Sequence, residues 1–207
     1  KHKNPRNIVI HHQKSQFRVK GGLDYVTYLD KLLGCSLPKS SVKMELPDYE
    51  FLVFEDLSKM VAEIKIKNKK FGLSRVLAGY SWKWISKGSE NKFDIVIGDV
   101  KLKWNSVSDD WINSQNSVNE VGCIHTTQGY DLNYTGIIFG NEISYDKLNN
   151  EIIIQKDNYH DKTGKNSISD PNELKTFIVN IYKTMMLRGI KGTYIYACNK
   201  DLQDYFK

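Results

Sequence analysis

Apolar residues recur along this 207-residue chain with two spacings, one typical of strands and one typical of helices. Short apolar runs of strand length lie at 7–11, 49–54, 76–78, 93–97, 121–125, 134–139, 152–154 and 193–197. Helical spacing occurs instead over 23–33, 57–64 and 174–186, and a last short helix is expected at 201–206. Strands that alternate with amphipathic helices predict an α/β fold, with a mostly parallel sheet and helices on both faces.

The third of these helices has the clearest predicted boundaries. Asp170 can cap its first turn, Pro171 occupies the first helical position, and Glu173 completes a capping box. Gly189 and Gly192 are expected to end it, because glycine accepts the left-handed conformation common after a helix.

The chain 1–207 is predicted to be one domain with loop insertions near 85–92 and 155–170. No internal repeat and no long linker rich in Gly, Ser or Pro divides it. The stretch 157–169 contains almost nothing apolar and is expected to be a mobile surface loop.

The composition, 40% hydrophobic and 26% charged, is typical of soluble globular proteins. No apolar run approaches the ~20 residues that cross a bilayer, so no membrane partner is expected. The three cysteines are widely spaced, which supports neither a disulfide framework nor a metal site and favours a reducing, cytoplasmic location. The first residue, Lys1, follows no initiator Met, and we interpret this end as a cut inside a longer protein, with a removed pro-segment as the alternative.

The formal net charge is +6, and only four of the thirty Lys and Arg residues are Arg. A modest positive excess fits a polyanionic partner and equally fits a solvated, Lys-rich surface. Arginine is more informative, because its planar fork grips phosphate in a way that Lys does not. The four candidates are Arg6, Arg18, Arg75 and Arg188.

Two elements of an ATPase are absent from the sequence. There is no GxxxxGK(S/T) phosphate loop, and no apolar strand ends in the Asp-Glu pair that would hold magnesium. If the chain is part of an ATPase, those elements lie outside it.

Three segments nevertheless carry a family resemblance: 15–18 (SQFR), 121–131 (VGCIHTTQGYD) and 182–189 (YKTMMLRG). In these, and over 75–84 and 189–194, the sequence resembles superfamily 1 DNA/RNA helicases. It is more closely similar to a bacterial helicase-like family related to the Schlafen group. The resemblance implies a C-terminal RecA-like domain, of the P-loop NTPase type but lacking the P-loop.

The resemblance implies a nucleotide site that includes Gln16, Phe17, Arg18 and Arg188. Phe17 and Arg18 are similar to the fourth motif, whose aromatic lies against adenine and whose Arg reaches the γ-phosphate. Arg188 is similar to the arginine finger of the sixth motif, although Leu187 stands where Thr is commonest. A core Phe beside a surface Arg, and a cation at a helix C-terminus, are the structural alternatives. The interpretation requires Arg18 and Arg188 to converge at one edge of the sheet.

The segment 125–131 is similar to the fifth motif, a strand that turns through small polar residues and Gly into a helix. Asp131 falls where the family often has a Glu that contacts the ribose, and the Gly129 backbone can meet phosphate oxygens. The residues implied to contact nucleic acid are His125, Thr126, Thr127 and Gln128. The alternative is an ordinary strand–turn–helix in which the hydrogen bonds of the His are made within the protein.

Aromatic residues interleave with lysines over 80–111, a pattern that suits stacking of single-stranded nucleic acid. Among them Trp82 is taken as the candidate contact, although most of these aromatics could instead belong to the core. The set comprises Tyr80, Trp82, Trp84, Trp104 and Trp111, with Lys83, Lys101 and Lys103.

The predicted function is therefore the second motor domain of an ATP-dependent DNA/RNA helicase or translocase. Its expected partners are single-stranded or duplex nucleic acid and a preceding RecA-like domain of the same chain. ATP and Mg²⁺ are expected in the full-length protein, whereas this chain alone should bind neither and should be inactive. Two alternatives stay open: a metal-dependent nuclease built on Asp94, Asp99 and Lys101, and a non-catalytic nucleic-acid-binding module.

Overall fold

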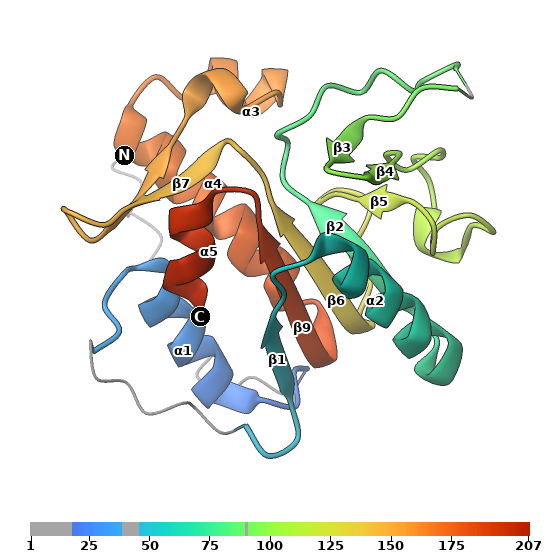
Figure 1. The fold of residues 1–207 in the computed structure, drawn as a ribbon, viewed down its shortest axis with the longest axis horizontal. Helices are drawn as coiled ribbons and strands as arrows, with labels where there is room; N and C mark the ends of the chain where they lie inside the picture. The colour runs from blue at the N-terminus through green and yellow to red at the C-terminus, as the bar shows by residue number, and fades with distance from the viewer. Residues whose placement is uncertain (1–17, 39–45, 90) are drawn as a thin grey trace, which may run out of the picture.

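A five-stranded sheet forms the centre of the computed structural model, which describes residues 18–38, 46–89 and 91–207 (Figure 1). Every neighbouring pair of strands is parallel. The order across the sheet is β1 (Glu50–Val53), β9 (Gly189–Ala197), β6 (Leu132–Phe139), β2 (Ser74–Ala78), β5 (Val121–Gly122). The predicted α/β class with a mostly parallel sheet is confirmed, and the arrangement is consistent with a RecA-like fold. The predicted strand at 7–11 lies outside the described residues.

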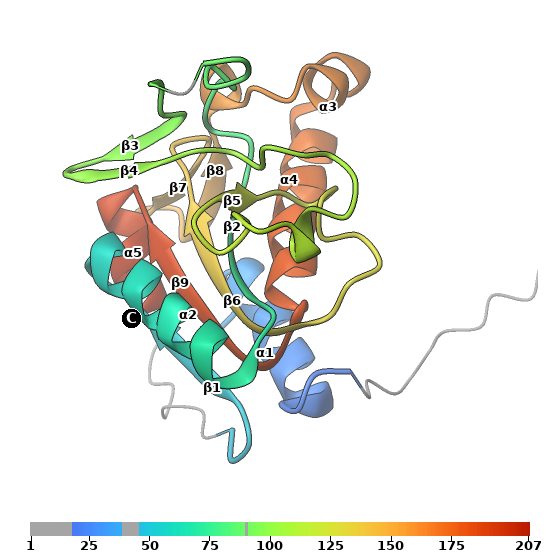
Figure 2. The same cartoon turned by 90° about the vertical axis from the view of Figure 1, so that its right-hand side faces the viewer.

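Helices cover both faces of the sheet, as predicted (Figures 1 and 2). One face packs on α2 (Leu57–Phe71), whose Met60 and Ile64 are fully buried. The other face packs on α1 (Gly22–Leu33), α4 (Pro171–Met186) and α5 (Lys200–Phe206), which share one hydrophobic core. No helix within the described residues is long and apolar enough to cross a membrane.

Short elements extend this framework beyond the central sheet. Two antiparallel hairpins are present, one formed by β3 (Ile95–Ile97) with β4 (Val100–Leu102) and one by β7 (Ile143–Asp146) with β8 (Glu151–Ile154). The remaining elements are the 3-10 turns η1 (Trp111–Asn113) and η2 (Lys156–Asn158) and the helix α3 (Lys162–Ser167).

The stretch 157–169, predicted to be a mobile surface loop, instead contains part of η2 and all of α3. Tyr159 is its anchor: the ring is 1% exposed, and its hydroxyl donates to Asp161 at 3.2 Å. The backbone nitrogen of His160 also donates to the Tyr80 carbonyl at 2.7 Å. One buried aromatic residue therefore holds a segment whose composition is otherwise polar.

The end of α4 also differs from the prediction. Asp170 does cap the first turn, accepting from the backbone nitrogens of Asn172 and Glu173 at 2.7 and 3.0 Å. Gly189 and Gly192, however, are residues of β9 and neither has a positive φ. They serve close packing instead, since a Cβ on Gly189 would lie 2.2 Å from the Gly192 carbonyl oxygen.

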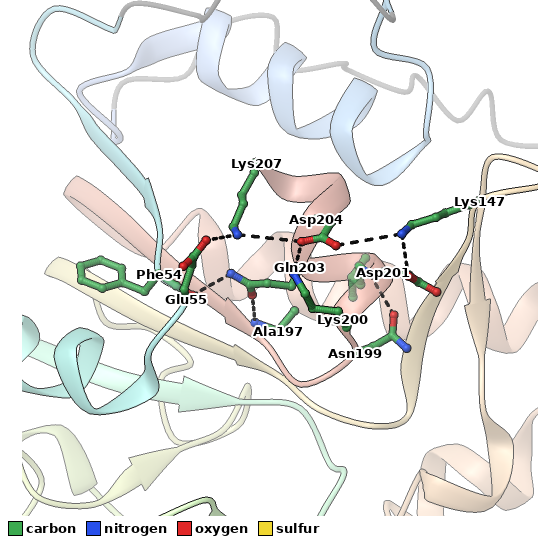
Figure 3. Close-up of polar contacts among 11 residues, drawn as sticks. Phe54, Glu55, Lys147, Ala197, Asn199, Lys200, Asp201, Gln203, Asp204 and Lys207 are labelled. Atoms are coloured by element: carbon green, nitrogen blue, oxygen red, sulfur yellow. Dashed lines mark hydrogen bonds and ion pairs between the residues drawn. The ribbon is translucent and has the colours of Figure 1, made fainter.

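The helix α5 is held against the sheet by a buried amide (Figure 3). Gln203, 5% exposed, donates to the Phe54 carbonyl and accepts from the Ala197 backbone nitrogen, both at 2.7 Å. Surface ion pairs flank these bonds and join Lys207 to Glu55, and Lys147 to Asp201 and Asp204. The ends of β1 and β9 are therefore linked through one side chain.

The cap of α4 gives a test of how much its first turn contributes to stability. Asp170→Ala removes the acceptor of two backbone donors and should lower the free energy of unfolding by about 1 kcal/mol. Urea denaturation measures this change, with Asp109→Ala, in an exposed bend, as the matched control. Equal stability of the two variants would contradict the assigned role of the cap.

Candidate functional site

Three charged side chains from distant parts of the chain meet where β6 and β9 begin. The Nε atom of Arg18 lies 2.8 Å from Oδ1 of Asp131. Nη1 of Arg188 donates to the carbonyl of Tyr130 at 3.3 Å, and the charges of Arg18 and Asp131 both act on the Arg188 guanidinium. We call Arg18, Asp131 and Arg188 the arginine cluster. The structure thus brings the two predicted arginines to one edge of the sheet.

Strand pairing explains this convergence. Asp131 directly precedes β6 and Arg188 directly precedes β9, and these strands are neighbours in the sheet. The backbone nitrogen of Leu132 donates to the Arg188 carbonyl at 2.9 Å, which joins the two strand starts. Arg18 reaches the same edge because the nearby Lys20 nitrogen donates to the Ile190 carbonyl at 2.9 Å.

The electrostatics of the arginine cluster favour an additional anion. Partial burial lowers the pKa of Arg188, and the neighbouring charge of Arg18 lowers it further, while Asp131 acts in the opposite direction. The Nε atom of Arg188 is buried and has no hydrogen-bond partner among the residues that the structure describes. A buried donor left unpaired costs about 1–3 kcal/mol, so an anionic oxygen placed there would recover that cost. Two guanidiniums beside one carboxylate therefore fit phosphate oxygens.

This edge of the sheet carries the cationic side chains of Arg18 and Arg188. Within the part of the chain that the structure describes, no group of three or more His, Cys, Asp or Glu is placed to hold a metal ion. The sequence also lacks the phosphate loop. The guanidinium groups of the arginine cluster fit the phosphate oxygens of a nucleotide.

The nine residues 123–131, here called the return segment, lead from the end of β5 back to the start of β6. The predicted strand to 125 and the helix after it were both wrong, because β5 ends at Gly122 and a series of turns follows. Side-chain hydroxyls take the place of a helix. Thr126 accepts from the Cys123 nitrogen at 2.9 Å, and Thr127 donates to the Cys123 carbonyl at 3.1 Å. Both threonines are buried and hold the turn.

Three other candidates in the return segment reach the surface: His125, Gln128 and Gly129 are exposed. Gly129 has a φ of +86°, a conformation that side-chain-bearing residues rarely adopt. Tyr130 follows, and its hydroxyl donates to Asp110, which raises the pKa of Tyr130. The turn that carries these exposed groups is therefore held before them, at Cys123, by the threonine bonds and after them by the bond from Tyr130 to Asp110.

His125 and Trp82 belong to an aromatic group near the C-terminal ends of β2 and β5. The rings of His125 and Tyr80 are 6.1 Å apart, those of Tyr80 and Trp104 are 6.2 Å apart, and Trp82 meets Trp104 edge-on at 6.5 Å. Trp82 is half-buried, whereas Trp104 and Trp111 are core residues that are 4% and 0% exposed. The aromatic group thus lies at the opposite end of the parallel strands from the arginine cluster.

Sequence reasoning missed one exposed aromatic beside these residues. Phe93 is 38% exposed, and Nζ of Lys103 lies 5.5 Å from its ring centre. The apolar run at 93–97 had placed Phe93 in a predicted strand, but β3 begins only at Ile95. Gln16 and Phe17 lie outside the described residues, so their roles in holding adenine stay predictions.

The geometry around Asp94 bears on the nuclease alternative. Its carboxylate is 7% exposed and accepts from the nitrogens of Ile85, Ser86 and Trp104 at 2.6–2.8 Å and from the Ser86 hydroxyl at 2.6 Å. Both carboxylate oxygens are engaged in holding the loop after β2 against β4. Asp94 is a structural brace in this arrangement, and a metal ion would have to displace these donors.

A parallel sheet with helices on both faces is the architecture of an α/β domain and is consistent with a RecA-like fold. The chain matches, over residues 1–199, the family described as "Schlafen group 3, DNA/RNA helicase domain", and it therefore belongs to that family. Membership supports a helicase-like domain that binds nucleic acid in general.

One similar protein comes from yeast. "Uncharacterized protein YPL245W" of Saccharomyces cerevisiae (strain ATCC 204508 / S288c) is 28% identical over 211 residues, which cover 92% of this chain. The matched part is 46% of that protein, so the chain spans about half the length of its relative. No solved structure matches the chain significantly.

The role of Asp94 can be tested by removing its carboxylate. Asp94→Ala leaves four donors without an acceptor and should lower the free energy of unfolding by about 3 kcal/mol. Denaturant titration measures the change, and incubation with plasmid DNA and Mg²⁺ or Mn²⁺ tests cleavage by the unmodified chain. Metal-dependent cleavage that disappears in a stable Asp94→Ala variant would restore the nuclease alternative.

Proposed function

We propose that this chain is the second, C-terminal RecA-like motor domain of a superfamily 1 type, ATP-dependent DNA/RNA helicase or translocase. The convergence of Arg18 and Arg188 beside Asp131, at one edge of a parallel sheet, carries the proposal. The family to which the chain belongs supports the same class.

In this proposal ATP binds between a preceding RecA-like domain and the arginine cluster. The preceding domain supplies the phosphate loop and the Mg²⁺ site, which this sequence lacks. Arg188 stabilises negative charge that develops on the γ-phosphate. Its buried Nε has no acceptor among the described residues. The resemblance assigns the adenine contact to Phe17, with Gln16 beside it.

Arg18 has a second partner in this scheme. In the structure its guanidinium contacts Asp131, and both side chains are partly exposed, at 51% and 40%. An exposed ion pair contributes little to stability, at most about 1 kcal/mol, so a phosphate can take over Arg18 at small cost. Asp131 would then be released toward the ribose, the contact that the resemblance assigns to this position.

Nucleic acid would contact the exposed part of the return segment. His125, Gln128 and the backbone of Gly129 are the groups that reach solvent. Direct contact by Thr126 and Thr127 would require their hydroxyls to give up the bonds to Cys123, so we assign them the role of holding the turn. Closure and reopening of the ATP cleft would move the two motor domains along the strand.

The proposal predicts that the 207-residue chain alone hydrolyses almost no ATP. In a protein that joins it to the preceding domain, Arg188→Ala should reduce kcat about 10³-fold or more, because an arginine finger contributes about 10³–10⁵ to phosphoryl transfer. Arg188→Lys should restore little, since an ammonium lacks the guanidinium fork. Coupled-enzyme ATPase assays at saturating nucleic acid measure these rates.

Lys156→Ala is the matched control, because Lys156 is an exposed cation in η2, away from the arginine cluster. It should leave kcat unchanged. Robust ATP hydrolysis by the isolated chain would contradict the proposal. Full activity of a folded Arg188→Ala variant would instead favour the non-catalytic binding module.

A further inference from the structure

The loop after β2 and the β3–β4 hairpin present aromatic rings to solvent with lysines above them. Trp84 is 44% exposed and Nζ of Lys87 lies 5.5 Å from its ring centre. Phe93, 38% exposed, is paired in the same way with Lys103. We call this region the lysine–aromatic surface; it consists of Lys83, Trp84, Lys87, Phe93, Lys101 and Lys103. Exposed aromatic rings beside cations are the elements of a stacking platform.

The lysine–aromatic surface is held in place although it lies outside the central sheet. Asp94 fastens the loop residues Ile85 and Ser86 to the hairpin through the buried bonds described above. At the other end, Val121 of β5 donates to the Lys103 carbonyl at 2.9 Å and its own carbonyl accepts from Asn105 at 3.0 Å. The two exposed rings are therefore attached to one rigid support.

Charge distinguishes this surface from an ordinary apolar patch. The segment 82–104 contains five lysines against Glu90, Asp94 and Asp99. The Asp94 carboxylate is turned inward and saturated by donors, so it offers nothing to repel an approaching phosphate. The surface left to a partner is cationic and aromatic, which fits a polyanion that also carries flat apolar groups.

The position of the lysine–aromatic surface is compatible with the path of a bound nucleic-acid strand. The half-buried Trp82 directly precedes Lys83 in the chain, and through the buried Trp104 and the half-buried Tyr80 it belongs to the same aromatic group as the exposed His125. Figures 1 and 2 both place the β3–β4 hairpin away from α1, whose N-terminal end adjoins Arg18. Binding there would leave the arginine cluster open.

We propose that the lysine–aromatic surface binds single-stranded nucleic acid, with bases stacked on Trp84 and Phe93 and phosphates facing the lysines. Unpaired bases are required because the faces of bases inside a duplex are already stacked on their neighbours. The inference deepens the nucleic-acid part of the proposed function and does not depend on ATP hydrolysis by any protein.

The test measures binding of the 207-residue chain to fluorescein-labelled dT₁₅, U₁₅ and a 15-base-pair duplex by anisotropy. Trp84→Ala and Phe93→Ala should each weaken single-strand binding about tenfold, the loss typical of one stacked base. Lys87→Gln and Lys103→Gln should each reduce the slope of log affinity against log salt by about 0.7. The dT₁₅ and U₁₅ arms show whether DNA or RNA is preferred.

Phe177→Ala is the matched control, because Phe177 on α4 is also 38% exposed and lies outside the surface. It should bind both oligonucleotides like the unmodified chain, and thermal melting should show all variants folded. Unchanged affinity of folded Trp84→Ala and Phe93→Ala, or equal affinity of the chain for duplex and single strands, would overturn the proposal. Failure to bind any oligonucleotide at 50 mM salt would do the same and would indicate a protein partner.

The two proposals fail separately. Both proposals would be supported if Trp84→Ala weakens single-strand binding and Arg188→Ala lowers the ATPase rate as expected. Normal ATPase in Arg188→Ala would remove the motor assignment but leave the stacking surface intact, because binding is measured without nucleotide.

Discussion

The parallel pairing of β6 with β9 is the interaction on which the rest of the molecule depends. It is the longest pairing in the sheet, running from Leu132 and Gly189 to Phe139 and Ala197. The residue before each strand is charged, so pairing of the strands also sets the distance between Asp131 and Arg188. Gly189 allows the irregular start of β9, where the register with β6 shifts, because a side chain there would meet the backbone of Gly192 in the same strand. Core packing and site geometry thus share one constraint.

Much of this framework could be predicted from local pattern. Apolar runs located the described strands of the sheet, and Asp170 and Pro171 located the start of α4, because burial and capping leave periodic or positional marks. The arginine pair could be predicted only through the family resemblance. Its contact with Asp131 could not, since an ion pair between residues 18 and 131 depends on strand register that no short window of sequence contains.

The errors have physical causes of the same kind. A single buried ring, Tyr159, orders a stretch whose composition reads as loop. Hydroxyl-to-backbone bonds from Thr126 and Thr127 replace the helix expected after β5. Phe93 belongs to an apolar run yet faces solvent, because β3 starts two residues later. In each case a specific contact or chain position, rather than the average character of the segment, decides the local structure.

The shortness of the return segment has a mechanical consequence. Parallel strands are usually joined through a dozen or more residues and a helix, whereas this link has nine residues and no helix. Its first half is bonded to Cys123 and its last residue adjoins the Leu132–Arg188 bond, so there is no slack to take up. Torsion imposed at either end falls on Gly129, whose backbone alone in the segment has a positive φ. Gly129 is therefore the position about which this segment would bend.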